Sequence, residues 1–209
     1  MNKSLIIACD GEAASGKSTG AKLLSKKYKL LLLNSGLLYR YASKLLITKK
    51  PKKPIQYLKK IFKKVSYNLI KKQLLHTQEI SNHVSYLAKN KAVREIMKIY
   101  QKRIIKKNKR ICVEGRDIAT KILNKNPRYN LAFYFTCKIN IAAKRRWKEL
   151  KKKVPLKEVQ KSLAKRTKMD KNRKYSPLKK AKDAILICTD RLSKKEVLIR
   201  MSNEVDKII

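Results

Sequence analysis

The chain contains few acidic residues and few glycines. Its 209 residues include 56 Lys and Arg against 14 Asp and Glu, which gives a formal net charge of +42 at pH 7. Such an excess favours a polyanionic partner, but the lysines are spread over nearly every segment instead of forming one tract. We therefore interpret the lysines mainly as side chains that cover solvent-exposed faces of the protein. We expect only weak, nonspecific binding of polyanions and no specific nucleic-acid partner.

Cysteine and histidine are also scarce, which argues against a disulfide framework or a zinc site. The four cysteines (Cys9, Cys112, Cys137 and Cys188) show no CxxC spacing and lie in or beside apolar runs. We expect them to be buried, reduced thiols. The sequence also has no apolar run long enough to span a bilayer and no signal-peptide pattern, so we expect a cytoplasmic protein with no membrane partner.

Short apolar runs alternate along the chain with segments of helical periodicity. The runs are Leu5 to Cys9, Leu30 to Leu33, Ile111 to Val113, Leu131 to Phe135 and Ala184 to Cys188. Strands that alternate with helices are typical of a parallel sheet. The sequence therefore predicts an α/β fold with a five-stranded parallel sheet and helices on both faces.

No Ser/Gly-rich linker divides the chain, so residues 1–209 are expected to form a single domain. A Lys-rich stretch between residues 40 and 85 has no clear strand. We interpret it as an insertion in which a loop is followed by an amphipathic helix at about residues 55–70. A second basic region, at about residues 145–175, is predicted to be a mobile cover over the active site.

The segment Gly11-Glu12-Ala13-Ala14-Ser15-Gly16-Lys17-Ser18 fits the phosphate-loop pattern G-x-x-x-x-G-K-[ST]. The chain has only five glycines, so the occurrence of two of them at the required spacing by chance is improbable. The glycines let backbone N–H groups point at the β-phosphate, Lys17 adds charge at the β- and γ-phosphates, and the Ser18 hydroxyl is suited to Mg²⁺. We therefore predict that the segment from Gly11 to Thr19 binds Mg·ATP.

Arginine is the rarer basic residue, with twelve positions in a chain that otherwise uses lysine. Arginines at turns are therefore expected where a planar, bidentate group is needed, and as a set they indicate recognition of more than one phosphate. The positions in question are Arg40, Arg94, Arg116, Arg145, Arg146, Arg166 and Arg173. A guanine-binding NTPase is disfavoured, because Asn124-Lys125-Asn126-Pro127 lacks the Asp of an NKxD motif.

Taken in order, the motifs of the chain resemble those of the bacterial cytidylate kinases. They are Asp10-Gly11-x-Ala13-Ala14-Ser15-Gly16-Lys17, Asn34-Ser35-Gly36-x-x-Tyr39-Arg40, Val93-Arg94, Gln101, Glu114-Gly115-Arg116-Asp117, Arg145-Arg146-Trp147-Lys148-Glu149-Leu150, Arg166, Asp170-x-Asn172-Arg173, Ser176-Pro177-Leu178 and Ala181-x-Asp183-Ala184. The resemblance covers nearly the whole chain. It implies a P-loop nucleoside monophosphate kinase with an NMP-binding insertion at about residues 36–105 and a lid at about 145–175.

The resemblance also implies roles for individual residues. Ser35, Arg40, Arg116 and Arg173 would hold the CMP phosphate, Ser85, Arg94 and Asp117 would read cytosine, and Arg166 and Asp170 would hold the sugar. Cytosine offers an N4 donor and the N3 and O2 acceptors, so a carboxylate and a guanidinium complement it. The alternative role for Asp117 and Asp170 is to pair with neighbouring arginines and hold the loops.

The chemistry implied by this match requires no general base. A nucleotide 5′-phosphate has a second pKa of about 6 and is already largely dianionic at neutral pH. Catalysis then depends on alignment and charge neutralisation by Mg²⁺ and cationic side chains. The residues expected to supply these charges are Lys17, Arg145 or Arg146, Arg166 and Arg173.

We therefore expect a monomer that transfers the γ-phosphoryl group of ATP to CMP or dCMP. Two alternatives remain open: another small P-loop kinase acting on UMP, AMP or a metabolite, and a basic RNA-associated P-loop protein. The chain also departs from the family pattern. Glu12 stands where Pro is common, Ser18-Thr19 stands where Gly-Thr is common, and the insertion lacks a recognisable small sheet.

Overall fold

The computed structural model describes residues 4–209, with the backbone alone for Gln78. The chain forms two compact units. One consists of the chain up to Leu33 together with Asn108–Ile209, and the other is Asn34–Lys107.

A five-stranded sheet forms the centre of the first unit. Its strands are β1 (Leu5–Gly11), β2 (Leu31–Asn34), β3 (Arg110–Gly115), β4 (Leu131–Thr136) and β5 (Ile185–Cys188). The strand order is β2-β3-β1-β4-β5, and β1 runs parallel to both β3 and β4, as β4 does to β5. The predicted five-stranded parallel α/β fold is confirmed.

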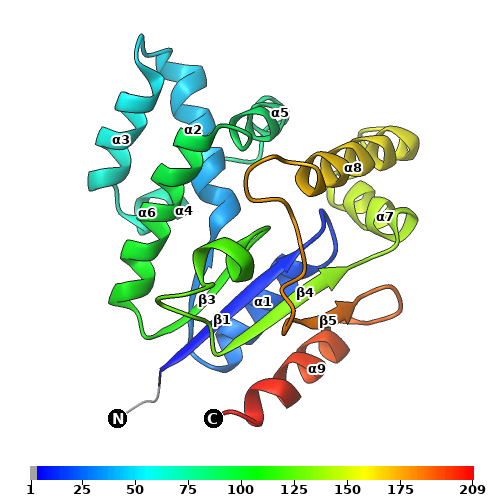
Figure 1. The fold of residues 1–209 in the computed structure, drawn as a ribbon. Helices are drawn as coiled ribbons and strands as arrows, with labels where there is room; N and C mark the ends of the chain where they lie inside the picture. The colour runs from blue at the N-terminus through cyan, green and yellow to red at the C-terminus, as the bar shows by residue number, and fades with distance from the viewer. Residues whose placement is uncertain (1–3) are drawn as a thin grey trace. The chain divides into compact units, whose positions relative to one another are not determined.

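Two helices, α1 (Lys17–Lys27) and α9 (Lys194–Asp206), pack on the same face of this sheet (Figure 1). Leu24 of α1 and Met201 of α9 are fully buried in one cluster with Phe135 of β4. Side chains alternate along a strand, so the neighbours of the clustered residues point to the other face. That face carries the short π-helix η1 (Ile118–Ile122), which contacts β1.

A pair of helices occupies the region predicted to be the lid. They are α7 (Ile139–Glu149) and α8 (Leu156–Lys171). Leu163 of α8 and Trp147 of α7 belong to a second apolar cluster that also includes Ala13 of the phosphate loop. The cluster connects the helix pair to the loop through packing.

The second unit is built from helices. They are α2 (Ser35–Lys49), α3 (Pro54–Lys64), α4 (Tyr67–Lys71), α5 (Gln78–Leu87) and α6 (Lys91–Lys107). The prediction of one amphipathic helix over residues 55–70 is wrong, because the chain is extended at Val65 and Ser66. The Ser66 side chain accepts a hydrogen bond from the Leu69 N–H and so starts a separate helix, α4.

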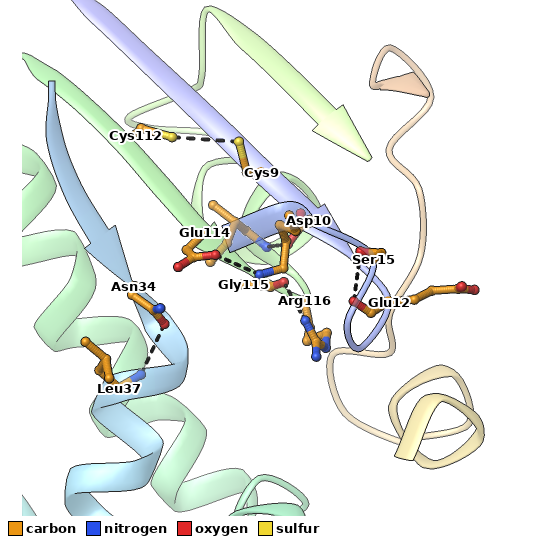
Figure 2. Close-up of polar contacts among 12 residues, drawn as sticks. Cys9, Asp10, Glu12, Ser15, Asn34, Leu37, Cys112, Glu114, Gly115 and Arg116 are labelled. Carbon is orange, nitrogen blue, oxygen red and sulfur yellow. Dashed lines mark hydrogen bonds and ion pairs between the residues drawn. The ribbon is translucent and has the colours of Figure 1, made fainter. Parts of the chain in front are cut away.

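The cysteines follow the prediction with one exception. Cys9 and Cys112 are fully buried on neighbouring strands with their sulfurs 3.7 Å apart (Figure 2). Cys137 is buried as well. Cys188 is exposed, because it ends β5, an edge strand whose residues are partly open to solvent. Among the described residues, no helix is long and apolar enough to cross a membrane.

Candidate active site

The phosphate loop lies between β1 and α1, where the sequence predicts it. Gly11 begins the loop with φ 155°, and a Cβ at this position would lie 2.4 Å from the Phe135 carbonyl oxygen. Gly16 ends it with φ 80°, in the left-handed region that favours glycine, and caps α1. The loop is also held from within, because Ser15 Oγ donates to the Glu12 carbonyl at 3.0 Å (Figure 2). The N-terminus of α1 thus opens onto a fixed loop, an arrangement suited to binding phosphate.

Lys17, the loop lysine, forms a buried ion pair with Glu114. Its Nζ lies 2.9 Å from Glu114 Oε2, and the two side chains are only 8% and 1% exposed. Burial by itself would raise the pKa of Glu114, but Lys17, together with Ser18 and Arg116, holds the pKa below its usual value. The pair places a carboxylate at the carboxyl end of β3, directly beside the loop.

Sequence reasoning did not single out Glu114 as a site residue. It is opposite Cys9 in the pairing of β3 with β1, and it also interacts with the Ser18 side chain. A carboxylate at this place on a neighbouring strand is typical of P-loop enzymes, in which it supports the metal ion. Its position at the end of a predicted strand was the signal that could have identified it.

Asp10, the residue before the loop, anchors the segment that follows β3. It is buried, and its two carboxylate oxygens accept the backbone N–H groups of Ile118 and Ala119, both at 2.8 Å. Burial raises the pKa of Asp10 to about 7, although the two hydrogen bonds act in the opposite direction. Figure 2 shows Asp10 and Glu114 near one another at the ends of their strands. The segment held in this way carries Arg116 and Asp117.

Three of the residues expected to hold the acceptor nucleotide form one ionic network. Arg116 Nε donates to Asp170 Oδ2 at 2.9 Å, and Arg173 lies 3.4 Å from the other oxygen, Oδ1. Burial would raise the pKa of Asp170, but Arg116, Arg173 and Arg166 together hold it below its usual value. Arg173 also donates to the Ser176 carbonyl at 2.7 Å. The alternative structural role of Asp170, pairing with arginines, is therefore observed.

The two neighbouring arginines of α7 differ in their surroundings. Arg145 donates to the hydroxyl and the carbonyl of Thr189 at 2.9 and 2.6 Å, and the Thr189 hydroxyl donates to the Ser15 carbonyl at 3.0 Å. Arg146 instead pairs with Glu149 on the same helix at 3.0 Å. Of the two, only Arg145 is linked to the phosphate loop by these contacts.

The remaining predicted residues lie in the second unit. Arg40 donates to the Leu75 carbonyl at 2.9 Å and to Ser81 Oγ at 3.0 Å. Ser35 is buried at the start of α2, and Ser85 is half-buried on α5. Within this unit Arg40 is therefore fixed against α5 and the segment that connects α4 to it.

Arg94, in α6, is the one buried charged side chain among the described side chains of the second unit. Its guanidinium donates to the Ala88 carbonyl at 3.1 Å and lies 5.7 Å from the centre of the Tyr39 ring. A buried guanidinium held by a carbonyl and an aromatic ring has a fixed orientation. This is the property that a residue reading a base requires.

Among the described residues, no group of three or more His, Cys, Asp or Glu side chains could hold a metal ion by itself. A magnesium ion in a P-loop enzyme takes most of its ligands from water and the nucleotide, and few from the protein. The Ser18 hydroxyl and the Glu114 carboxylate are oxygen ligands of the kind it prefers. The donor set therefore fits a nucleotide-bound Mg²⁺.

Comparison with known proteins identifies similar sequences along nearly the whole chain. A family model described as Cytidylate kinase matches residues 7–207. A "Cytidylate kinase" of Clostridium botulinum (strain Okra / Type B1) is 34% identical over 96% of this chain and 97% of its own. A "Bifunctional pantoate ligase/cytidylate kinase" of Prochlorococcus marinus (strain MIT 9312) is 38% identical over the full chain, which spans only 43% of that relative's length.

Solved structures share the fold at low sequence identity. An uncharacterized protein from Eubacterium ventriosum ATCC 27560 has a TM-score of 0.60 at 16% identity, covering 98% of this chain and 99% of that one. A shikimate kinase from Bacteroides thetaiotaomicron has a TM-score of 0.51 at 11% identity, covering 97% and 98%. These likenesses concern the fold alone.

Proposed function

Because the chain belongs to the cytidylate kinase family, we propose that it transfers the γ-phosphoryl group of Mg·ATP to CMP or dCMP. The products are ADP and CDP or dCDP. The observation that supports this best is that two loops lie next to each other at the carboxyl ends of adjacent strands. The phosphate loop follows β1 and the Arg116–Asp117 segment follows β3, and these strands are paired with Asp10 opposite Gly115. Ligands of open α/β sheets bind at the carboxyl ends of the strands.

The donor half of the proposed site is the phosphate loop. Residues Gly11 to Thr19 would surround the phosphates of ATP, with Lys17 at the β- and γ-phosphates. Ser18 and Glu114 would hold Mg²⁺ directly or through water. The metal ion, when bound, neutralises charge on the β- and γ-phosphates. The pairing of Lys17 with Glu114 at 2.9 Å supports this role, because it holds the ammonium group beside the carboxyl end of β3.

The acceptor residues are assigned from the family motifs that carry them. In this proposal Arg116 and Arg173 bind the CMP phosphate together with Ser35 and Arg40 of the second unit, which we infer is the NMP-binding insertion. Asp170 then serves two purposes. It holds Arg116 and Arg173 in place, and it offers a carboxylate to the sugar alongside Arg166. The lid arginines would neutralise the transferring phosphoryl group, and the geometry favours Arg145 over Arg146 for this role.

Cytosine recognition is assigned to Asp117 with Arg94 and Ser85. The Asp117 carboxylate accepts from the N4 amino group, and the Arg94 guanidinium donates to N3 and O2. Uracil has an oxygen in place of the amino group, which would face the carboxylate unfavourably. With UMP the Asp117 carboxylate would have no N4 amino group to pair with, and a site that leaves a buried polar group unpaired discriminates strongly against such an analogue.

A coupled assay of ADP release with CMP, dCMP, UMP, AMP and GMP as acceptors tests the function. We expect the largest kcat/KM with CMP or dCMP, and faster turnover with UMP or AMP would refute the acceptor assignment. Replacement of Asp117 by Ala is expected to lower the CMP-to-UMP ratio of kcat/KM by about tenfold or more. The matched control is Asp183→Ala, which removes an exposed carboxylate paired with Arg128 and is expected to leave this ratio unchanged.

A further inference from the structure

Among the described residues, three ion pairs involve the phosphate loop or the segments beside it. The pairs are Lys17 with Glu114 at 2.9 Å, Arg116 with Asp170 at 2.9 Å and Lys171 with Glu12 at 2.6 Å. The first two cations already have phosphate-binding roles in the proposed function. The third pair has no assigned role, and it contains Glu12, one of the residues at which the loop departs from the family pattern.

The backbone of Glu12 is held in place, whereas its side chain extends out of the loop. The N–H of Glu12 donates to the Phe135 carbonyl at 3.1 Å, and its own carbonyl accepts from Ser15 Oγ. The carboxylate points away from Glu114 and Arg116 (Figure 2). There it meets Lys171 Nζ, the ammonium group of the last residue of α8.

The end of α8 is fixed beside the loop independently of this ion pair. Asp170 precedes Lys171 directly, is bound to Arg116 and Arg173, and its carbonyl accepts the Leu178 N–H at 2.8 Å. The backbone of Lys171 is therefore held in place. Its long side chain is 49% exposed and free to change partner within a small radius, whereas Glu12 is 18% exposed.

We propose that Lys171 is a further phosphate-binding residue of the donor site and that Glu12 is its exchangeable counter-ion. The proposal rests on the assignment of ATP as the donor. A polyphosphate in the loop carries several negative charges and attracts the ammonium group more strongly than one carboxylate does. Lys171 then exchanges its ion pair with Glu12 for a hydrogen bond to a phosphate oxygen, and no covalent bond changes.

The exchange predicts opposite effects of the two partners on ATP binding. Loss of Lys171 removes a charge-assisted hydrogen bond to phosphate. Loss of the Glu12 charge frees Lys171 and also removes a negative charge from the rim of the loop. If the pair only tied α8 to the loop, both substitutions would weaken binding.

The test is an equilibrium titration without Mg²⁺, followed by the fluorescence of Trp147, the single tryptophan of the chain. Trp147 packs in the cluster that contains Ala13 of the loop and Leu163 of α8, so it is placed to report nucleotide binding. AMP, ADP and ATP are titrated into the wild type, Glu12→Gln, Lys171→Gln, the double variant and Lys168→Gln. Lys168 is an exposed lysine of the same helix and serves as the matched control.

We expect Lys171→Gln to raise the Kd of ATP about fivefold to tenfold, the Kd of ADP less and the Kd of AMP hardly at all. Glu12→Gln is expected to lower the Kd of ATP by about twofold to fivefold, and by less when Lys171 is already replaced. Lys168→Gln stays within about twofold of the wild type for all three nucleotides, as an exposed charge should.

Weaker ATP binding in Glu12→Gln, or an effect of Lys171→Gln no larger than that of Lys168→Gln, overturns the proposal. Both criteria rest on the Kd of ATP, which is measured with ATP as the single nucleotide present, so they do not depend on the identity of the acceptor. A wild-type protein that binds no ATP refutes the proposed function itself and this inference with it. ATP binding that is indifferent to Lys171 refutes the inference alone.

Discussion

Replacement of Lys17 by Met separates the structural from the catalytic role of the phosphate-loop lysine. Lys17 and Glu114 lie 2.9 Å apart and are almost completely buried. At an effective dielectric constant near 20, the attraction between charges at this distance is about 6 kcal/mol before desolvation is counted. Removing one partner of such a pair leaves a buried charge uncompensated and typically costs about 3–5 kcal/mol.

The substitution is therefore expected to lower the free energy of unfolding by about 3 kcal/mol and the Tm by about 6–12 °C for a chain of this size. This loss of unfolding free energy depends on pH. In the wild type the pKa of Glu114 is held low, so the pair stabilises the fold above the ordinary pKa of a glutamate and this contribution is lost as pH falls. In Lys17→Met burial raises the pKa of Glu114, so the destabilisation grows as pH rises from about 4.5.

Urea unfolding followed by circular dichroism at pH 5 and pH 8 measures both effects. We expect the variant to be closer to the wild type at pH 5. Adding Glu114→Gln removes the uncompensated charge, so the double variant recovers most of the stability while phosphoryl transfer stays reduced by about 100-fold or more. An unchanged urea midpoint in Lys17→Met, or no recovery in the double variant, would refute this account of a desolvated ion pair.

Two further substitutions test the packing around the sheet. Gly20→Ala is expected to cost about 1–3 kcal/mol of unfolding free energy, because its Cβ would lie 2.9 Å from Phe135 Cζ and 3.1 Å from Met201 Sδ. Urea denaturation measures this, and a loss no greater than that of Lys26→Ala, an exposed change in the same helix, would contradict it. Ser193→Ala removes the N-cap of α9, whose hydroxyl accepts from the Glu196 N–H at 3.2 Å, and is expected to cost about 1 kcal/mol. Ser193→Asp is the control, because Asp also caps helices and should retain most of the stability in thermal melts.

The sequence was sufficient to predict features that depend on local patterns. The strands are short apolar runs, and the phosphate loop is defined by glycines at fixed spacing, so both could be located from neighbouring residues alone. The break at Val65 and Ser66 was missed because the apolar periodicity continues through it, and only the serine cap marks the new helix. The exposure of Cys188 was missed because the order of strands in the sheet, which places β5 at an edge, cannot be read from its apolar run.

The ion pairs of the site were beyond sequence reasoning for a different reason. Glu114 is 97 residues from Lys17, and Lys171 is still farther from Glu12 along the chain. Charge is abundant in this sequence, so composition gives no indication of which lysine meets which carboxylate. Only the fold determines these partners, because it brings the ends of β1, β3 and α8 together.

The anchoring of the phosphate loop has a consequence for the thermodynamics of nucleotide binding. The Glu12 N–H donates to the Phe135 carbonyl of β4, and the Ser15 carbonyl accepts from Thr189, the residue after β5, so two separate segments hold the loop. Ordering a flexible backbone costs about 1–2 kcal/mol per residue. Here that ordering is completed when the chain folds, so ATP meets a preorganised loop and more of its interaction energy appears as affinity.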